Sequence, residues 1–154
     1  SQILANFINY SYSEFYYKKL VLMFQKEVAD RILAKDNSKN YGRLSIFSSW
    51  KLNIKKIMDI NPSSFFPKPK VMSSLLIFEP KINYIKFKNS KNLEHITNVF
   101  FNQRRKMIKK PLNILFKDSR EVVNELGLNI NLRPQNLKKD TFYKICLIYE
   151  KLIN

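Results

Sequence analysis

The sequence contains few of the residues that build cofactor cradles, disulfide frameworks and metal clusters. Its 154 residues include two glycines, one cysteine and one histidine. A single cysteine, Cys146, excludes a disulfide framework and a cysteine-based metal cluster, and it fits a reducing cytoplasm. The glycines, at positions 42 and 127, form no GxGxxG or Walker-type loop, so no nucleotide cradle is visible. We therefore expect no metal site and a cytoplasmic protein.

Long apolar runs are also missing. No stretch approaches the roughly 18 to 20 apolar residues of a membrane span, and no secretory signal is recognisable, so we expect no membrane association. The hydrophobic fraction of 45% is nevertheless that of a folded protein. A chain of this length can bury one core, or one core and a small helical annex, but not two large domains.

Acidic residues are scarce. Twelve Asp and Glu stand against 28 Lys and Arg, which gives a formal net charge of +16. This excess indicates a polyanionic partner, with nucleic acid favoured over an anionic membrane surface. The basic residues are spread over both halves of the chain, so they do not form a detachable basic tail. A coding bias towards lysine and asparagine is an alternative source of part of the excess.

The first 87 residues alternate between helical and strand patterns. Apolar residues recur at helical spacing in 3–8, and a short apolar run with basic flanks at 18–24 predicts a buried strand. The remaining patterns predict helices at 25–34 and 43–52 and strands at 53–60 and 71–80. This order predicts an α/β arrangement that ends in two neighbouring strands.

From about Lys88 onwards the pattern is helical only. Leu93, Ile96, Phe100 and Met107 are expected to share one helix face. A second helix is predicted over 118–127, with Asp118 or Ser119 as its cap and Gly127 as its stop, and a third over 137–153. The predicted organisation is therefore α/β followed by all-α, with domains at 1–87 and 88–154.

The stretch "SSFFPKPKVMSS" (63–74) joins the last two predicted strands. Pro67 and Pro69 fix their own φ angles and push the preceding residues towards extended backbone, so an aromatic ring in this loop is held in place. Phe65 and Phe66 can either plug the edge of the sheet or face a ligand. Composition alone favours the first role, because aromatic residues are more often core than ligand contacts.

Five stretches, in order, resemble the rRNA adenine dimethyltransferases that modify the small ribosomal subunit. They are "MFQKEVADRI" (23–32), "SKNYGRLSI" (38–46), "FxPxPKVxS" (65–73), "FNQRRKMIKKPL" (101–112) and "LRPQNLKKDTFYKI" (132–145). The resemblance implies that residues 1–87 are the C-terminal half of a Rossmann-like methyltransferase domain and that 88–154 are the family's small helical domain. Ser1 matches a position just after the family's Asn-Leu-Pro-Tyr motif, so we expect the front half to be missing.

That resemblance also implies a function for the intact protein. Members transfer methyl groups from S-adenosylmethionine to the exocyclic amines of two adjacent adenines, and Phe65 matches the residue thought to stack on the target adenine. The donor would be bound by the missing N-terminal half, so we expect no cofactor-binding residue here and no activity from this chain alone. The family usually has aspartate where Met72 stands, so any polar contact of that side chain is lost or moved.

The partner implied by the resemblance is small-subunit rRNA or the immature small ribosomal subunit, with the intact protein a monomer. An alternative is a non-catalytic RNA-binding or ribosome-assembly module, and a DNA-binding factor is a third hypothesis. The candidate RNA-binding residues are Arg104, Arg105, Lys106, Lys109, Lys110, Lys68, Lys70 and Arg43.

The stretch 102–110 is the densest basic cluster. If it is helical, Arg105 and Lys109 lie four residues apart, as do Lys106 and Lys110, and a nearby phosphate backbone would relieve their repulsion. A solvated helix face is the alternative, but adjacent arginines favour phosphate binding.

Four single residues leave narrower choices. Arg43 is either a phosphate contact or the partner of an acid such as Glu27. His95 is expected on the surface rather than as a catalytic base, and Cys146 as a small buried hydrophobe. Trp50 ends a helical pattern and could equally belong to the core.

Overall fold

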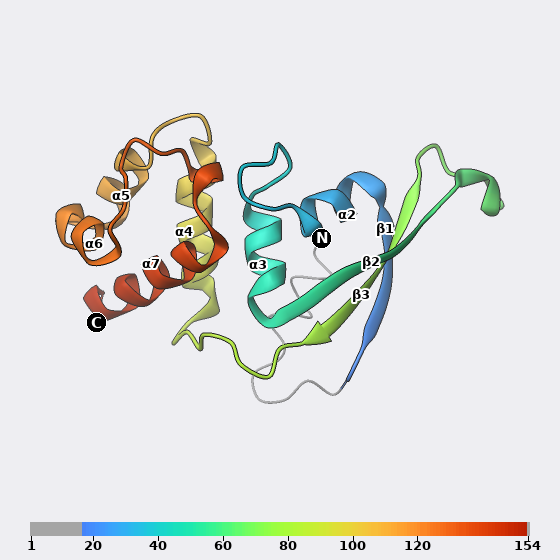
Figure 1. Cartoon of the computed structure of the whole chain (residues 1–154), viewed down its shortest axis with the longest axis horizontal. Helices are drawn as coiled ribbons and strands as arrows, with labels where there is room; N and C mark the ends of the chain where they lie inside the picture. The colour runs from blue at the N-terminus through green and yellow to red at the C-terminus, as the bar shows by residue number, and fades with distance from the viewer. Residues whose placement is uncertain (1–16, 154) are drawn as a thin grey trace. The chain divides into compact units, whose positions relative to one another are not determined.

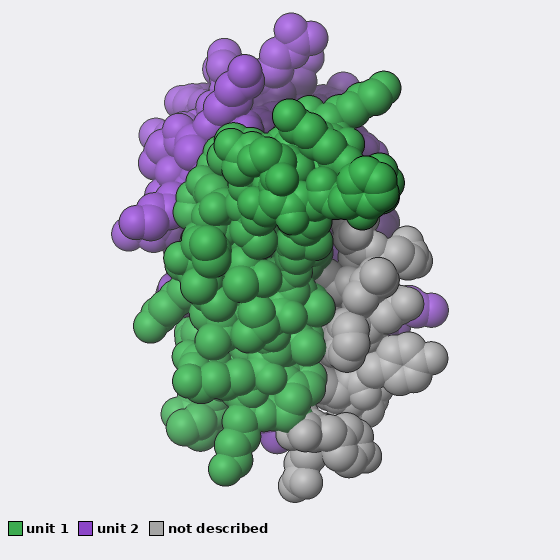
Figure 2. Space-filling view, turned by 90° about the vertical axis from the view of Figure 1, so that its right-hand side faces the viewer, with its two compact units in different colours: residues 1–34, 48–84 green, residues 35–47, 85–154 purple. Residues whose placement is uncertain are grey.

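The structure is a computed structural model that describes residues 17–153. The helix predicted over 3–8 lies outside this range. The chain forms two compact units, coloured separately in Figure 2. Unit 1 comprises residues 1–34 and 48–84, and unit 2 comprises residues 35–47 and 85–154. Helix α3 (Arg43–Lys51) contributes its first half to unit 2 and its last turn to unit 1.

Unit 1 contains a three-stranded antiparallel sheet in the order β1-β3-β2 (Figure 1). The strands are β1 (Leu20–Gln25), β2 (Leu52–Ile60) and β3 (Ser73–Pro80), which confirms the three predicted strands with shifts of a few residues. The first was expected to be buried, and this is wrong, because Val21 and Met23 of β1 are about half exposed. In the central strand β3, Leu76 and Phe78 are buried while Leu75, Ile77 and Glu79 are less so, as the two-residue period of a strand requires. The Phe24 ring meets the edge of Phe78 at 6.0 Å.

One helix covers this sheet. Helix α2 (Lys26–Leu33) follows β1 directly, buries Ala29 and Ile32, and packs against β2 and β3. Its first amide, that of Lys26, donates to the carbonyl of Met72 at 2.8 Å. The helix predicted over 25–34 is confirmed, and its start is fixed to the beginning of β3.

Trp50 belongs to the core of unit 1, where only 3% of its surface is exposed. Its ring meets the Tyr84 ring edge-on at 6.2 Å. The Lys51 ammonium lies 4.5 Å from the centroid of Trp50 and 5.5 Å from that of Tyr84. Burial lowers the pKa of Lys51, and the aromatic faces partly compensate for the lost hydration of its charge.

Unit 2 is helical. Its main helices are α4 (Ser90–Asn102), α5 (Lys109–Leu115), α6 (Ser119–Leu126) and α7 (Lys139–Leu152). The Asp118 carboxylate caps α6 by accepting from the Arg120 amide, and Gly127 ends it in the left-handed region at φ 59°. The predicted cap and stop of this helix are therefore confirmed, as is the α/β part followed by helices.

The core of unit 2 forms where α4 packs against α7. Leu93, Ile96 and Phe100 are fully buried, and Phe100 meets Phe142 edge-on at 5.3 Å. Met107 was expected on the same helix face, and this prediction is wrong. Helix α4 ends at Asn102, and Met107 lies beyond it with 55% of its surface exposed.

Residues 35–47 are tied into unit 2 by two buried tyrosines. The Tyr41 hydroxyl donates to the Leu137 carbonyl at 2.9 Å, and the Tyr143 hydroxyl donates to the Ile46 carbonyl at 2.7 Å. Burial raises the pKa of Tyr41, which keeps it a donor. Cys146 is also fully buried, and burial raises the pKa of its thiol to about 12, so the prediction of a small buried hydrophobe is confirmed.

Glu150 is a buried carboxylate, 4% exposed, that joins α7 to the start of α4. It accepts hydrogen bonds from the amides of Lys88 (2.9 Å) and Asn89 (3.0 Å) and from the side chain of Asn92 (2.9 Å). Burial by itself raises the pKa of Glu150, but these hydrogen bonds outweigh it and hold the pKa below its usual value. In the described part of the chain no helix is long and apolar enough to cross a membrane.

Replacing Glu150 with alanine is expected to lower the free energy of unfolding by about 2–3 kcal/mol, because the Lys88 and Asn89 amides lose their acceptor in a buried site. Urea denaturation measures this. Glu125→Ala, which removes the same charge from an exposed position, is the control and should change little. Because the pKa of Glu150 is lower in the folded state than in the unfolded state, its carboxylate stabilises the fold at pH values above the unfolded pKa. The difference in unfolding free energy between wild type and Glu150→Gln should therefore shrink as the pH falls below about 4. An unchanged advantage would contradict this assignment.

Candidate nucleic-acid interface

The loop of residues 61–72 lies at the tip of the β2–β3 hairpin (Figure 1). The strands are paired up to Ile60 and Ser73, so the loop begins where the sheet ends. The Asn61 side chain accepts hydrogen bonds from the amide (3.1 Å) and hydroxyl (3.0 Å) of Ser63, and this cap starts the short 3-10 helix η1 (Pro62–Ser64). The Phe66–Pro67 peptide bond is cis.

The two phenylalanines of the loop differ in exposure. Phe65 is half-buried, whereas Phe66 is fully exposed. A fully exposed ring does not plug a sheet edge, so that role is excluded for Phe66. Phe65 keeps part of its surface accessible while the loop holds its backbone, and the exposed Lys68 and Lys70 follow it in the same loop.

A charged cluster fixes the base of this hairpin loop. The Asp59 carboxylate accepts from Lys26 Nζ at 2.7 Å, from Ser74 Oγ at 2.6 Å and from Lys56 Nζ at 3.1 Å. The hydrogen bonds from Lys26, then Ser74 and Lys56, hold the pKa of Asp59 far below its usual value. The carboxylate thus remains charged and connects the start of α2, the end of β2 and the start of β3.

The basic stretch 102–110 is not one helix. Residues 103–108 form a turn between α4 and α5, so the expected four-residue pairs of cations on a helix face do not exist there. The amides of Ile108 and Lys109 donate to the carbonyls of Leu132 (2.8 Å) and Ile130 (3.3 Å) instead of continuing α4. The helical pattern stops at Gln103, whose backbone leaves the helical region (φ −122°, ψ 47°).

Within this stretch the two arginines lie in different environments. The Arg104 guanidinium donates to Gln135 Oε1 at 3.3 Å and to the backbone carbonyls of Ser38 and Lys39. It thereby connects the turn to two other loops of unit 2. Arg105 and Lys106 are exposed. Position 43 also has a protein partner: Arg43 donates to Asn98 Oδ1 at 3.0 Å, whereas Glu27 accepts from Arg31.

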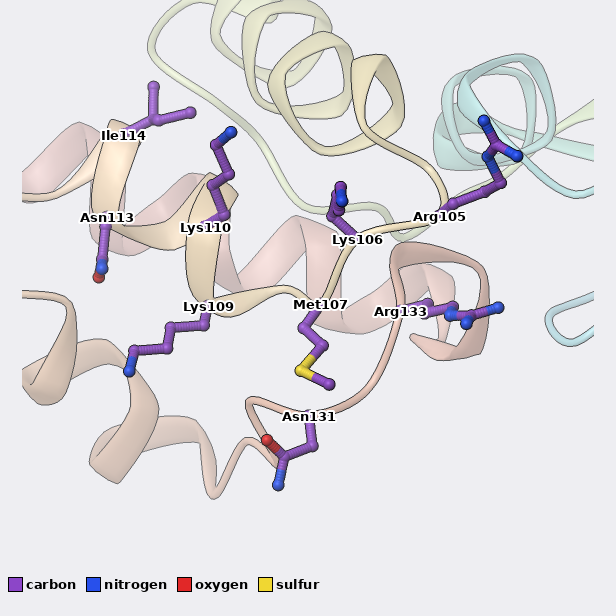
Figure 3. A pocket seen from close by; sticks show the side chains of 9 residues that line it. All are labelled: Arg105, Lys106, Met107, Lys109, Lys110, Asn113, Ile114, Asn131 and Arg133. Carbon is purple, nitrogen blue, oxygen red and sulfur yellow. The ribbon is translucent and has the colours of Figure 1, made fainter.

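A cavity of about 670 Å³ opens beside the turn (Figure 3). It is lined by Arg105, Lys106, Met107, Lys109, Lys110, Asn113, Ile114, Asn131 and Arg133. Five of these nine residues are cationic and none is acidic. The structure thus brings Arg105, Lys106, Lys109 and Lys110 together, as the sequence analysis expected of the cluster, while Arg104 lies outside the lining.

Five lining residues were not among the sequence candidates: Met107, Asn113, Ile114, Asn131 and Arg133. Asn131 and Arg133 come from a loop more than twenty residues away in sequence, and only the fold places them against the turn. The recognised stretch beginning at Leu132 was the one available signal for Arg133. His95 is exposed, as expected, with its ring 5.9 Å from that of Tyr149.

The residues present do not fit S-adenosylmethionine. Gly42 precedes α3 and lies against the Phe101 ring, and Gly127 caps α6, so neither opens a loop between a strand and a helix. Between residues 17 and 153, no group of three or more His, Cys, Asp and Glu side chains is placed to hold a metal ion.

Comparison with known families decides which proteins this chain is related to. The family profile of ribosomal RNA adenine dimethylase matches residues 1–151. The chain belongs to this family. It is 57% identical over 152 residues to ribosomal RNA small subunit methyltransferase A of Pelagibacter ubique, covering 99% of this chain and 58% of that protein. Its identity to the protein of the same name from Ehrlichia canis is 40% over 147 residues, covering 93% of this chain and 53% of that one.

Solved structures agree with this assignment. The fold matches the crystal structure of a dimethyladenosine transferase from Plasmodium falciparum with a TM-score of 0.81 at 26% identity, over 97% of this chain and 62% of that one. The 23S rRNA methyltransferase ErmE shares the fold at a TM-score of 0.57 and 13% identity, over 87% of this chain and 55% of its own. The chain therefore spans about half the length of its relatives.

Separate roles are predicted for the adjacent arginines. Arg104→Ala should lower the free energy of unfolding by about 1–3 kcal/mol, because the carbonyls of Ser38 and Lys39 lose a charged donor. Arg105→Ala should leave stability within about 0.5 kcal/mol, because its side chain is exposed. Chemical denaturation of both variants compares them, and equal losses of stability would contradict the distinction.

Proposed function

We propose that this chain is the part of an rRNA adenine dimethyltransferase that binds the target adenine and the RNA backbone around it. The observation that carries the proposal is the hairpin loop: Phe65 keeps an accessible surface, and the loop is tied at its base to the charged Asp59 cluster. The family profile and the names of the relatives supply the reaction class.

Phe65 acts in this proposal as a stacking surface. An adenine whose amine is to be methylated has to leave its base stack, and an aromatic face replaces the lost stacking at roughly 1–3 kcal/mol. The half-buried position suits this role, because packing orients the ring while one part of its surface remains open. Phe66, fully exposed beside it, is available to the flanking nucleotide.

The methyl donor of the intact protein is S-adenosylmethionine, and the residues that bind it lie outside this chain. The described residues offer no glycine-rich cradle, and the chain spans 58% of its Pelagibacter ubique relative. The substrate is a pair of adjacent adenines in small-subunit rRNA within the immature subunit. The intact protein acts as a cytoplasmic monomer.

Exposed cations bind the RNA backbone. Arg105, Lys106, Lys109 and Lys110 line one cavity without an acid among its lining residues, and Lys68 and Lys70 flank the aromatic loop. Each phosphate neutralised by a cation releases a counterion, so affinity should depend strongly on salt. Arg43 and Arg104 belong to this group more weakly, because Asn98 and backbone carbonyls already engage their guanidinium groups.

A second candidate function is a non-catalytic RNA-binding module. One observation favours it for this chain taken by itself: its described residues provide an aromatic loop and a basic cavity but no donor site. A hybrid protein separates the two functions. It joins the part of the Pelagibacter ubique relative that this chain does not cover to this chain.

The hybrid is expected to transfer labelled methyl groups from S-adenosylmethionine to unmethylated small ribosomal subunits. Phe65→Ala should lower this rate about 10- to 100-fold, because the extruded base loses its stacking partner, while RNA affinity changes less than about twofold. Phe65→Tyr, which retains the ring, is the matched control and should keep most of the rate. A folded hybrid that binds RNA without methylating it would favour the binding module. Equal losses of affinity and rate in Phe65→Ala would refute the stacking role.

Removing cations from the cavity should change the salt dependence of binding. Arg105→Ala combined with Lys106→Ala should weaken binding of single-stranded RNA and reduce the slope of log affinity against log salt by about 0.7 for each lost phosphate contact. Fluorescence anisotropy at several salt concentrations measures this slope. A pair of exposed lysines elsewhere, Lys91→Ala with Lys144→Ala, is the charge-matched control. If both double variants change the slope equally, net charge rather than this site determines binding.

A further inference from the structure

The cavity beside the turn contains more than a phosphate-binding surface needs. A groove that only follows a phosphate backbone requires cations, yet this cavity also presents two large apolar side chains, Met107 (55% exposed) and Ile114 (58% exposed). Apolar surface that stays exposed between cations gains free energy when a ligand covers it. A nucleotide combines negative charge with an apolar face.

The side chains that line the cavity suit different parts of a nucleotide. In Figure 3 the Met107 side chain extends toward the segment that carries Asn131, the Asn131 side chain extends from that segment away from Met107, and Lys109 and Arg133 lie on either side. In the described part of the chain the Asn131 side chain makes no hydrogen bond, so its amide is able to pair with a ligand. A carboxamide offers a donor and an acceptor together, and adenine presents the matching pair at N6 and N7.

Backbone hydrogen bonds join the two segments of the cavity that carry Met107 and Asn131. Ile108 N and Lys109 N donate to the carbonyls of Leu132 and Ile130, which places Met107 and Asn131 on facing segments. The segment that carries Asn131 and Arg133 is itself fixed. The backbone amide of Asn131 donates to Asn129 Oδ1 at 3.0 Å, and the backbone amide of Arg133 donates to Asn136 Oδ1 at 3.0 Å. Little ordering of the backbone is therefore required on binding, which favours affinity.

We propose that this cavity binds a single unstacked nucleotide of the RNA, separately from the adenine at Phe65. The base lies against the Met107 thioether with its edge on the Asn131 amide, and Lys109 and Arg133 bind the phosphates on its two sides. The inference rests on the proposed function, because it takes RNA as the ligand. It adds a base-binding site to a surface that otherwise contacts only the backbone.

The test compares three RNA hairpins that share one stem: one fully paired, one with a single bulged adenosine and one with an abasic residue at the bulge. Binding is measured in the Phe65→Ala background, so that the hairpin-loop site does not contribute. The bulged adenosine should bind about 5- to 30-fold more tightly than the abasic bulge, the usual gain from contact with one base. Met107→Ser and Asn131→Ala should each remove most of this difference without changing the salt slope.

Two controls separate base contact from charge and from folding. Lys109→Ala and Arg133→Ala should weaken binding of adenosine and abasic bulges equally and reduce the salt slope. Met58→Ser changes an equally exposed methionine of unit 1 (53% exposed) and should leave the preference for the base intact. Thermal melting of each variant, followed by circular dichroism, verifies that the fold is retained.

Each outcome decides the inference. Equal binding of adenosine and abasic bulges, with normal salt dependence, overturns the nucleotide site and leaves the proposed RNA-binding function standing. A preference for the base that survives both Met107→Ser and Asn131→Ala also overturns it. Absence of salt-dependent RNA binding would refute the site and the proposed function together.

Discussion

Two backbone hydrogen bonds join the segments that line the cavity of unit 2. The amides of Ile108 and Lys109, beyond the end of α4 at Asn102, donate to the carbonyls of Leu132 and Ile130. Had the helix continued, cations four residues apart would lie along one face and repel one another. The turn instead distributes them around a cavity, where a polyanionic ligand can neutralise several at once. The turn that follows α4 therefore also supplies part of the lining of this cavity.

A comparable constraint acts in unit 1. Asp59 carries its charge at the point where β2 ends, and it holds groups from α2, β2 and β3. The loop that carries Phe65 begins beside this cluster, and the Asn61 side chain caps its first turn. Stacking on a base is effective only when the ring does not lose conformational freedom on binding. The Met72 side chain is partly exposed, and the local polar contacts are made by Asp59 and by the Met72 carbonyl.

Local patterns predicted most of the fold. The cap Asp118, the stop Gly127 and the alternation in β3 each follow from interactions within a few residues, and such signals are readable from sequence. Met107 was assigned to the wrong structure because its helical spacing from Phe100 is fortuitous, and the backbone leaves the helical region at Gln103, before Met107. Asn131 and Arg133 were missed because only backbone pairing between distant segments places them beside the turn. A residue's membership in a site depends on tertiary pairing, which periodicity does not report.

The net charge of the sequence indicated a polyanionic ligand, but it did not show which cations are structural and which are exposed. Counting residues treats Arg104 and Arg105 alike, yet one guanidinium joins three loops of unit 2 while the other faces solvent beside the cavity. Arginine suits both tasks, because its planar fork of donors matches backbone carbonyls as well as phosphate oxygens. Folding decides between them by supplying carbonyls to the first arginine and leaving the second exposed. The high net charge of this chain is thus partly structural, and five of its exposed cations line the cavity that Met107 and Asn131 also line.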